Sequence, residues 1–177
     1  LIQAAPKSLA LALLGGAVFN LSNILLVAAI DIAGMAVAFP IGVGLALVIG
    51  VITNYMATPV GNPMVLFVGV ALVTAAMVVS AMAYRKKSDS AGKTKAKGII
   101  ISIMAGLLMG FFYRFVAASM ALDFAAPEAG KLTPYTASVV FSLGLLLSSF
   151  LWNTIVMYRP FSGEKVGFSD YFKQGDI

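Results

Sequence analysis

Two asparagines interrupt a long apolar stretch near the start of the chain. Asn20 and Asn23 lie in the middle of Ser8–Ile30, a run without Asp, Glu, Lys or Arg. At 100° per residue they share one face of a helix. Because an unpaired amide in hydrocarbon costs several kcal/mol, that face must meet protein or a cavity. Two interpretations stay open: amides bonded across a helix–helix contact, or amides that offer donor and acceptor to a hydroxylated or amide ligand.

A second polar site lies in the apolar run Gly98–Leu122, which contains Tyr113 and Arg114. Arg114 comes about 16 residues into the run, so it would lie roughly 24 Å from the start of a helix. From there its side chain can extend to the outer interface of a membrane. Alternatively it faces the bundle, where it contacts an anionic or hydroxylated substrate or pairs with a carboxylate.

The last apolar run, Thr133–Tyr158, carries a polar stripe. Ser138, Ser142, Ser149 and Asn153 follow one another at spacings of four, seven and four residues, which places them on one side of a helix. A polar stripe in an apolar span is expected to face protein or water. The predicted substrate-binding residues are therefore Asn20, Asn23, Tyr113, Arg114, Ser142 and Asn153.

The elements that would position these side chains are membrane spans. Of 177 residues, 60% are hydrophobic and 11% are charged, and the mean hydropathy is +0.98. A soluble domain of this length could not bury so much apolar surface. About 20 apolar residues cross the hydrocarbon core as a helix, which satisfies its own backbone. The composition predicts an all-α, polytopic transmembrane bundle of five spans: Ser8–Ile30, Met35–Tyr55, Pro63–Tyr84, Gly98–Leu122 and Thr133–Tyr158.

The short connection Asp31–Gly34 predicts that the first two spans are antiparallel neighbours. Asp31 is expected to cap the second span by accepting hydrogen bonds from its free amides. A carboxylate that couples transport to a proton or cation is the alternative.

Small residues recur at steps of four in the second span, and Gly106 and Gly110 repeat this spacing in the fourth. The pattern predicts close approach of neighbouring helices. Pro40 has no backbone N–H to donate, so the second span is expected to bend there. The small residues of the second span are Ala38, Gly42, Ala46 and Gly50.

Charge predicts the orientation in the membrane. The segment 85–97 holds six Lys and Arg residues against one acidic residue, so we expect it to be cytoplasmic. Nine cations then lie inside, two outside, and Arg114 within a span. The predicted organisation is three spans in residues 1–84, a basic linker in 85–97, two spans in 98–158, and an interfacial cytoplasmic tail in 159–177.

The absence of Cys and His removes the usual nucleophiles, bases and metal ligands, so no enzyme activity, metal or cofactor is expected. Gly92-Lys93-Thr94 lacks the flanking pattern of a phosphate-binding loop. The basic residues cluster at helix ends, which indicates topology and not nucleic-acid binding.

The runs NLSNILLVAAIDIAGMAVAFPIGVGLALVIG and PVGNPMVLFVGVALVTAAMVVSAMAYRK resemble bacterial permeases of the drug/metabolite transporter superfamily, near its glucose/ribose uptake and ureide permease branches. The most specific part is Asn-Xaa-Xaa-Asn followed by Ala-Phe-Pro-Ile-Gly. The resemblance implies ten spans in two inverted five-helix repeats. The five spans here would be the third to seventh, the basic linker would join the repeats, and the chain would be a piece of a longer protein.

The resemblance also implies a function. We expect a secondary transporter of the bacterial inner membrane that moves a small polar metabolite, first of all a sugar, by alternating access. A coupled H⁺ or Na⁺ would accompany it, and membrane lipid and the remaining spans would be its partners. A ureide or nucleobase permease or a drug exporter is the alternative within the superfamily, and a structural membrane subunit is the alternative from another class.

Overall fold

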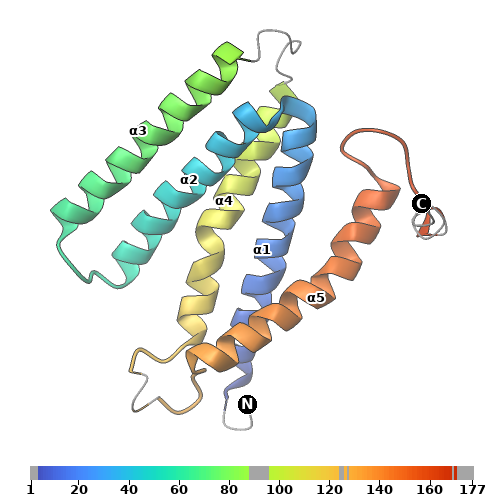
Figure 1. Cartoon of the computed structure of the whole chain (residues 1–177). Helices are drawn as coiled ribbons and strands as arrows, with labels where there is room; N and C mark the ends of the chain where they lie inside the picture. The colour runs from blue at the N-terminus through green and yellow to red at the C-terminus, as the bar shows by residue number, and fades with distance from the viewer. Residues whose placement is uncertain (1–3, 88–95, 124–125, 127, 169, 171–177) are drawn as a thin grey trace.

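Five helices make up the described part of the chain. The computed structural model describes residues 4–87, 96–123, 126, 128–168 and 170. These residues contain no strand, and all five helices are long and apolar enough to cross a membrane (Figure 1). This confirms the prediction of an all-α protein with five candidate spans. In chain order they are α1 (Pro6–Ala33), α2 (Met35–Ala57), α3 (Pro63–Lys87), α4 (Ala96–Ser119) and α5 (Pro134–Tyr158).

Proline residues mark the beginning of three helices. Pro6 and Pro134 lie in the first turns of α1 and α5, and α3 begins at Pro63. A proline is tolerated there because the first N–H groups of a helix have no partner within it. At the start of α5, the Thr133 hydroxyl oxygen also accepts a hydrogen bond from the N–H of Thr136 (3.4 Å). These local signals explain why the helix starts could be predicted.

The prediction that Asp31 caps the second span is wrong. α1 continues to Ala33, so Asp31 lies within its last turn, and Gly34 alone joins α1 to α2. Gly34 has a φ of +82°, a backbone conformation that glycine adopts at little cost. As the N-cap of α2 it has no side chain to offer. The Asp31 carboxylate instead accepts a hydrogen bond from the hydroxyl of Ser162.

The segment after α5 folds back onto the turn between α1 and α2. Besides the contact between Ser162 and Asp31, the Lys97 ammonium donates a hydrogen bond to the carbonyl oxygen of Phe161 (2.6 Å). The Phe161 side chain packs against a core cluster formed by α1, α2 and α4. The first residues of the predicted interfacial tail therefore join α5 to the other helices at this end of the bundle.

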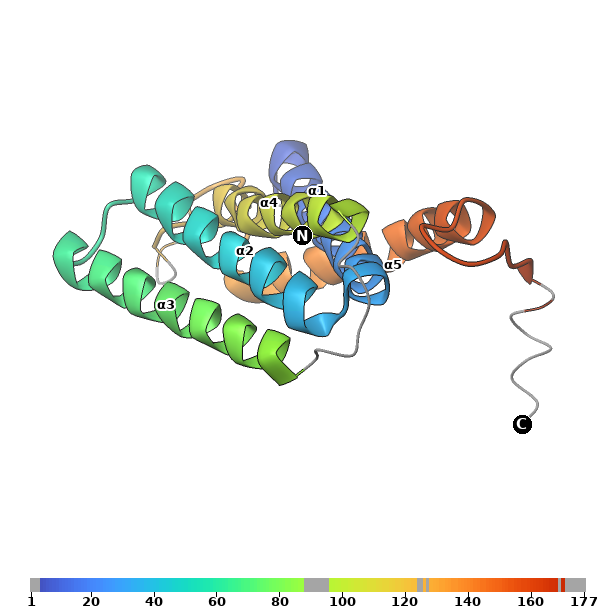
Figure 2. The same cartoon turned by 90° about the horizontal axis from the view of Figure 1, so that it is seen from above.

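α4 lies between α1 and α2 (Figures 1 and 2). It packs along both of them, whereas α3 packs against α2, and α5 packs mainly against α1. The prediction of antiparallel neighbours is thus only partly right. α1 and α2 run in opposite directions, but they diverge from Gly34 and α4 occupies the space between them.

The small residues of α2 allow α4 to approach closely, as predicted. Ala38, Gly42 and Ala46 are buried. A Cβ atom at Gly106 would come 2.6 Å from the carbonyl oxygen of Gly42, and one at Gly110 would come 3.2 Å from that of Ala46. These separations are shorter than ordinary Cβ contacts, so the two helices touch through their backbones.

A second close contact, which the sequence pattern did not predict, joins α1 to α5. A Cβ atom at Gly144 would overlap the carbonyl oxygen of Leu13, and one at Gly16 would overlap the carbonyl oxygen of Phe141. The two helices therefore cross with backbone against backbone. Beside the crossing, three aromatic rings from α1, α4 and α5 pack with centroids 4.7–6.0 Å apart: Phe19, Phe112 and Phe141.

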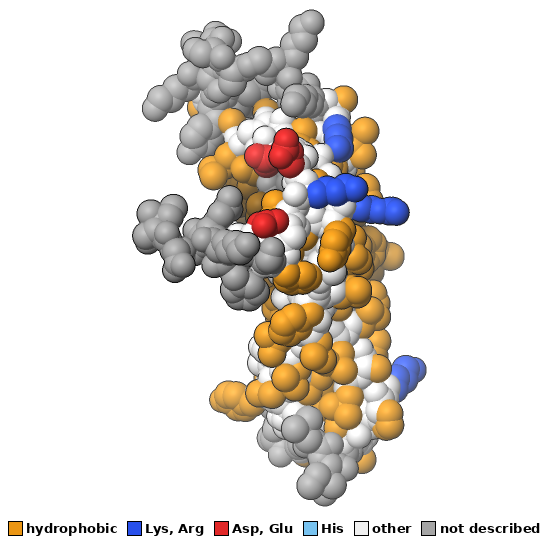
Figure 3. Space-filling model, turned by 90° about the vertical axis from the view of Figure 1, so that its right-hand side faces the viewer, with side chains coloured by type: hydrophobic (Ala, Val, Ile, Leu, Met, Phe, Trp, Pro, Cys, Tyr) orange, Lys and Arg blue, Asp and Glu red, His pale blue; other side chains and the backbone are white. Residues whose placement is uncertain are grey.

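Most large apolar side chains lie on the outside of the bundle. None of the residues in the window Pro63–Ser80 of α3 is buried. Figure 3 shows hydrophobic side chains over the middle of one face, with acidic side chains toward its upper end and basic side chains toward both ends. An apolar surface of this extent is not stable in water, and hydrocarbon is the solvent that suits it. The five helices therefore indicate a membrane protein, with α3 at its periphery.

Candidate functional site

Asn20 lies in the contact between α1 and α5. It is 8% exposed, and its amide nitrogen donates to the hydroxyls of Ser148 (3.0 Å) and Ser149 (3.1 Å) and to the carbonyl oxygen of Leu145 (3.3 Å). All three acceptors belong to α5. This geometry favours the interpretation of Asn20 as an interhelical contact.

Asn23 makes a different interaction. Its amide nitrogen donates to the carbonyl oxygen of Phe19, one turn earlier in α1 (2.9 Å), and its side chain is half-buried. The amide is therefore satisfied within its own helix. Although they share a helix, the two asparagines do not form one polar surface with each other.

This difference predicts unequal effects of two matched substitutions. Asn20→Ala removes the amide that donates to α5 and should lower the free energy of unfolding by about 1–2 kcal/mol. Asn23→Ala removes a bond within α1 and should cost less than about 0.5 kcal/mol, because the helix ladder remains intact. Thermal unfolding of both variants in a non-ionic detergent measures the difference. Equal losses would contradict the assignment of Asn20 to the helix contact.

The polar stripe of α5 divides between two environments. Ser149 faces α1 and accepts the Asn20 amide, whereas Ser142 and Asn153 are exposed. Trp152 is half-buried and donates its indole N–H to the carbonyl oxygen of Ala17 (3.3 Å). Within the predicted stripe, Ser149 is therefore the residue that bonds to α1 among the described residues.

Tyr113 and Arg114 line an open pocket where α2 ends, α3 begins and α4 ends, at the lower left of Figure 1. Its volume is about 480 Å³. Polar groups from α2 and the loop after it face the same space, which brings one guanidinium, two phenols, an amide and a hydroxyl together. The polar lining residues are Asn54, Tyr55, Thr58, Tyr113 and Arg114.

The Arg114 guanidinium has no hydrogen-bond or ion-pair partner among the described residues. The Asn54 amide donates to the carbonyl oxygen of Gly50 (2.7 Å), which leaves its own oxygen and one N–H for other partners. The Tyr55 ring stands edge-on to that of Phe67, with centroids 5.8 Å apart. Several hydrogen-bonding groups of the pocket are thus available to a ligand.

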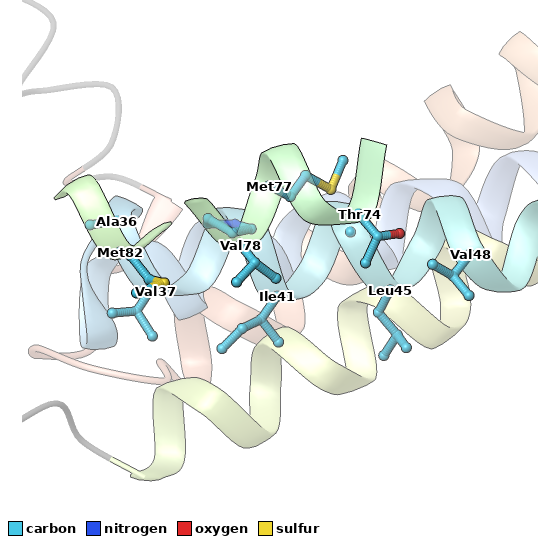
Figure 4. Close-up of a pocket in the computed structure, with 11 residues that line it drawn as sticks. Ala36, Val37, Ile41, Leu45, Val48, Thr74, Met77, Val78 and Met82 are labelled. Atoms are coloured by element: carbon cyan, nitrogen blue, oxygen red, sulfur yellow. The ribbon is translucent and has the colours of Figure 1, made fainter. Parts of the chain in front are cut away.

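A groove of similar size between α2 and α3 is almost entirely apolar (Figure 4). Its polar side chain, Thr74, donates to the carbonyl oxygen of Val70 (2.7 Å). Pro40 and Met77 line this groove and also a further apolar one on the other side of the same helix pair. These grooves suit hydrocarbon chains and offer little to a polar ligand.

The predicted site residues therefore fall into three places. Tyr113 and Arg114 share the pocket, the two asparagines of α1 lie elsewhere in the bundle, and Ser142 and Asn153 are on the outer side of α5. The pocket residues that sequence reasoning missed are Asn54, Tyr55 and Thr58.

No protein-family model, curated protein or solved structure matches this chain.

Proposed function

We propose that the chain is part of a secondary transporter for a small polar metabolite, with a sugar as the first candidate. The observation that supports this most is the pocket of Tyr113 and Arg114 at the ends of apolar helices. There a guanidinium with no partner among the described residues lies beside neutral hydrogen-bonding groups. Ionisable residues within candidate membrane spans are rare and typically mark substrate pathways. The resemblance to drug/metabolite transporter permeases supports the same function.

The helix arrangement is compatible with alternating access. α3 contacts the other helices through α2, and Pro40 leaves one backbone hydrogen bond of α2 unmade. A helix pair attached along one side can rock against α1 and α4, while the pocket lies at the α2–α4 contact. In this proposal the membrane is a bacterial inner membrane and the basic linker 85–97 is cytoplasmic. Residues 88–95 of that linker lie outside the described residues.

Uptake into vesicles that contain the protein tests the proposal. Radiolabelled sugars, nucleobases and ureides should be compared, and one class is expected to accumulate. Arg114→Gln should lower its uptake by at least about tenfold, the factor that corresponds to a loss of about 1.4 kcal/mol of binding. Arg159→Gln is the matched control, because Arg159 is exposed like Arg114 but lies after α5 and does not line the pocket. No uptake of any class, or equal loss in both variants, would count against a carrier.

A structural membrane subunit is the second candidate, and the Asn20 geometry favours it. The Asn20 amide, which could have lined a cavity, instead donates its hydrogen bonds to α5. If the chain only assembles, Asn20→Ala should weaken assembly while Arg114→Gln leaves every measured property unchanged.

A further inference from the structure

The Arg114 guanidinium differs from lysines near the helix ends. The Lys97 ammonium donates to the carbonyl oxygen of Phe161 (2.6 Å), and the Lys131 ammonium donates to that of Ala118 (2.7 Å). Both lysines have backbone partners within the protein. Arg114 lies inside α4 and has none among the described residues, although a guanidinium offers five N–H donors. Arg114 is exposed, so this hydrogen-bonding capacity is available to a ligand that enters the pocket.

Among the described residues, the lining of the pocket around Arg114 includes a positive charge but no acid. The nearest acid in sequence to that lining, Asp123, follows the lining residue Leu122 and accepts the N–H of Ala126 (3.4 Å). The other polar groups are neutral amides and hydroxyls. A ligand that brings negative charge would supply the missing partner, whereas a cation would be repelled.

The depth of the pocket suits an anion at a membrane interface. Arg114 precedes the end of α4 at Ser119 by five residues, about 8 Å along the axis, and Asn54 precedes the end of α2 by three residues, about 5 Å. Both side chains can thus meet solutes from water and also the headgroup layer. Arg114 is exposed and Asn54 is half-buried, so an anion that enters the open pocket from water can reach both side chains.

We propose that this pocket binds an anionic oxygen group, a phosphate or carboxylate, with Arg114 as its anchor. The planar guanidinium gives two parallel N–H donors to such a group, and the Asn54 amide and the Tyr113 hydroxyl add neutral hydrogen bonds to its other oxygens. The group can belong to a soluble metabolite or to a lipid headgroup. As a statement of substrate class the inference rests on the proposed function, but binding itself does not require transport.

Chemical modification of arginine tests the inference at single-residue level. The protein in a non-ionic detergent is treated with phenylglyoxal, and the modification rates of Arg114 and Arg159 are followed by peptide mass spectrometry. Exposed Arg159 is the internal control. Inorganic phosphate, gluconate, phosphatidylglycerol, glucose and phosphatidylcholine are added separately. A bound anion at twice its dissociation constant should slow modification of Arg114 about threefold, in proportion to the unoccupied fraction.

The outcomes separate the sources of the anion. Protection of Arg114 by phosphate or gluconate alone identifies a soluble ligand, and protection by phosphatidylglycerol alone identifies a headgroup. The anion that protects Arg114 should also raise the unfolding temperature of the native chain, and it should not raise that of Arg114→Gln. Protection of both arginines, or of neither, would overturn the inference. Protection without uptake would refute the carrier alone, and uptake of a neutral sugar without protection would refute the anion site alone.

Discussion

Gly144→Leu is expected to separate α5 from α1 and to cause a large loss of stability. A Cβ atom at this position would overlap the carbonyl oxygen of Leu13, and backbone cannot move aside as a flexible side chain can. Overpacking of this kind should cost about 3 kcal/mol, at the upper end of the usual range. The same separation would break the hydrogen bonds from Asn20 to α5. Thermal unfolding in detergent and the monodisperse fraction in size-exclusion chromatography measure both effects.

Gly69→Leu is the matched control for this substitution. Gly69 lies in α3, and a Cβ atom there would meet nothing within 4 Å. The added side chain would project from a helix that has no buried residue in the window Pro63–Ser80, so the unfolding temperature should stay within experimental error of the native value. If both substitutions had the same effect, the backbone contact between α1 and α5 would not exist as described.

The helices were predictable because the signals that specify them are local. Twenty apolar residues without a charge, or a proline in a first turn, can be read without knowledge of the fold. The small-residue spacing around Gly42 and Gly106 was informative for the same reason, since a ridge of small residues in a membrane helix allows another helix to approach closely. These predictions did not depend on which helix meets which.

The identity of each helix partner could not be predicted, because the apolar faces are nearly interchangeable. Gly16 and Gly144 resemble other glycines in apolar runs, and only their mutual position gives them a role. The position of α4 between α1 and α2 had no sequence signal either. The error at Asp31 has a similar origin: an acid before a helix is typically a cap, but here α1 continues past it.

The candidate site was predictable in part. A charge in an apolar run stands out, so Arg114 and its neighbour Tyr113 were found. Asn54 and Thr58 were missed because polar residues near the end of a span are common and need no function. The bonding of Asn20 to α5 depends on which helix lies opposite, and no spacing within α1 contains that information.

A disulfide between Asp31→Cys and Ser162→Cys is the second large expected effect. The two native side chains are in hydrogen-bonding contact, although 131 residues separate them in the sequence. The chain has no cysteine of its own, so the two introduced thiols are the sole candidates for oxidation. We expect mild oxidation with copper phenanthroline to form the bond in most molecules, which would then resist labelling by a maleimide of high mass.

The contact between Asp31 and Ser162 joins two parts of the bundle that a carrier would have to separate. Ser162 and Phe161 connect the end of α5 to the turn of α1 and α2 and to the start of α4, at the end of the bundle opposite the Arg114 pocket. A carrier that works by alternating access must open and close each end in turn. If the chain is the proposed carrier, a covalent bond here should therefore abolish uptake, and a reducing agent should restore it. Uptake that survives complete oxidation would show that these helices do not separate during transport.

A control pair distinguishes this contact from random collision of thiols. Ser138 is exposed near the start of α5. It lies 20 residues before Tyr158, the last residue of that helix, and thus about 30 Å along α5 from the end that leads to Ser162. Asp31→Cys combined with Ser138→Cys should remain fully labelled after oxidation. Asp31 contacts Ser162, just beyond the end of α5, whereas Ser138 lies near the start of that helix, too far away for a disulfide. If this pair cross-links as well as the first, the bonds form between molecules or in unfolded chains, and α5 does not reach the α1–α2 turn through Ser162. If only the first pair cross-links and uptake falls with it, the end of the bundle that carries Asp31 opens during the transport cycle.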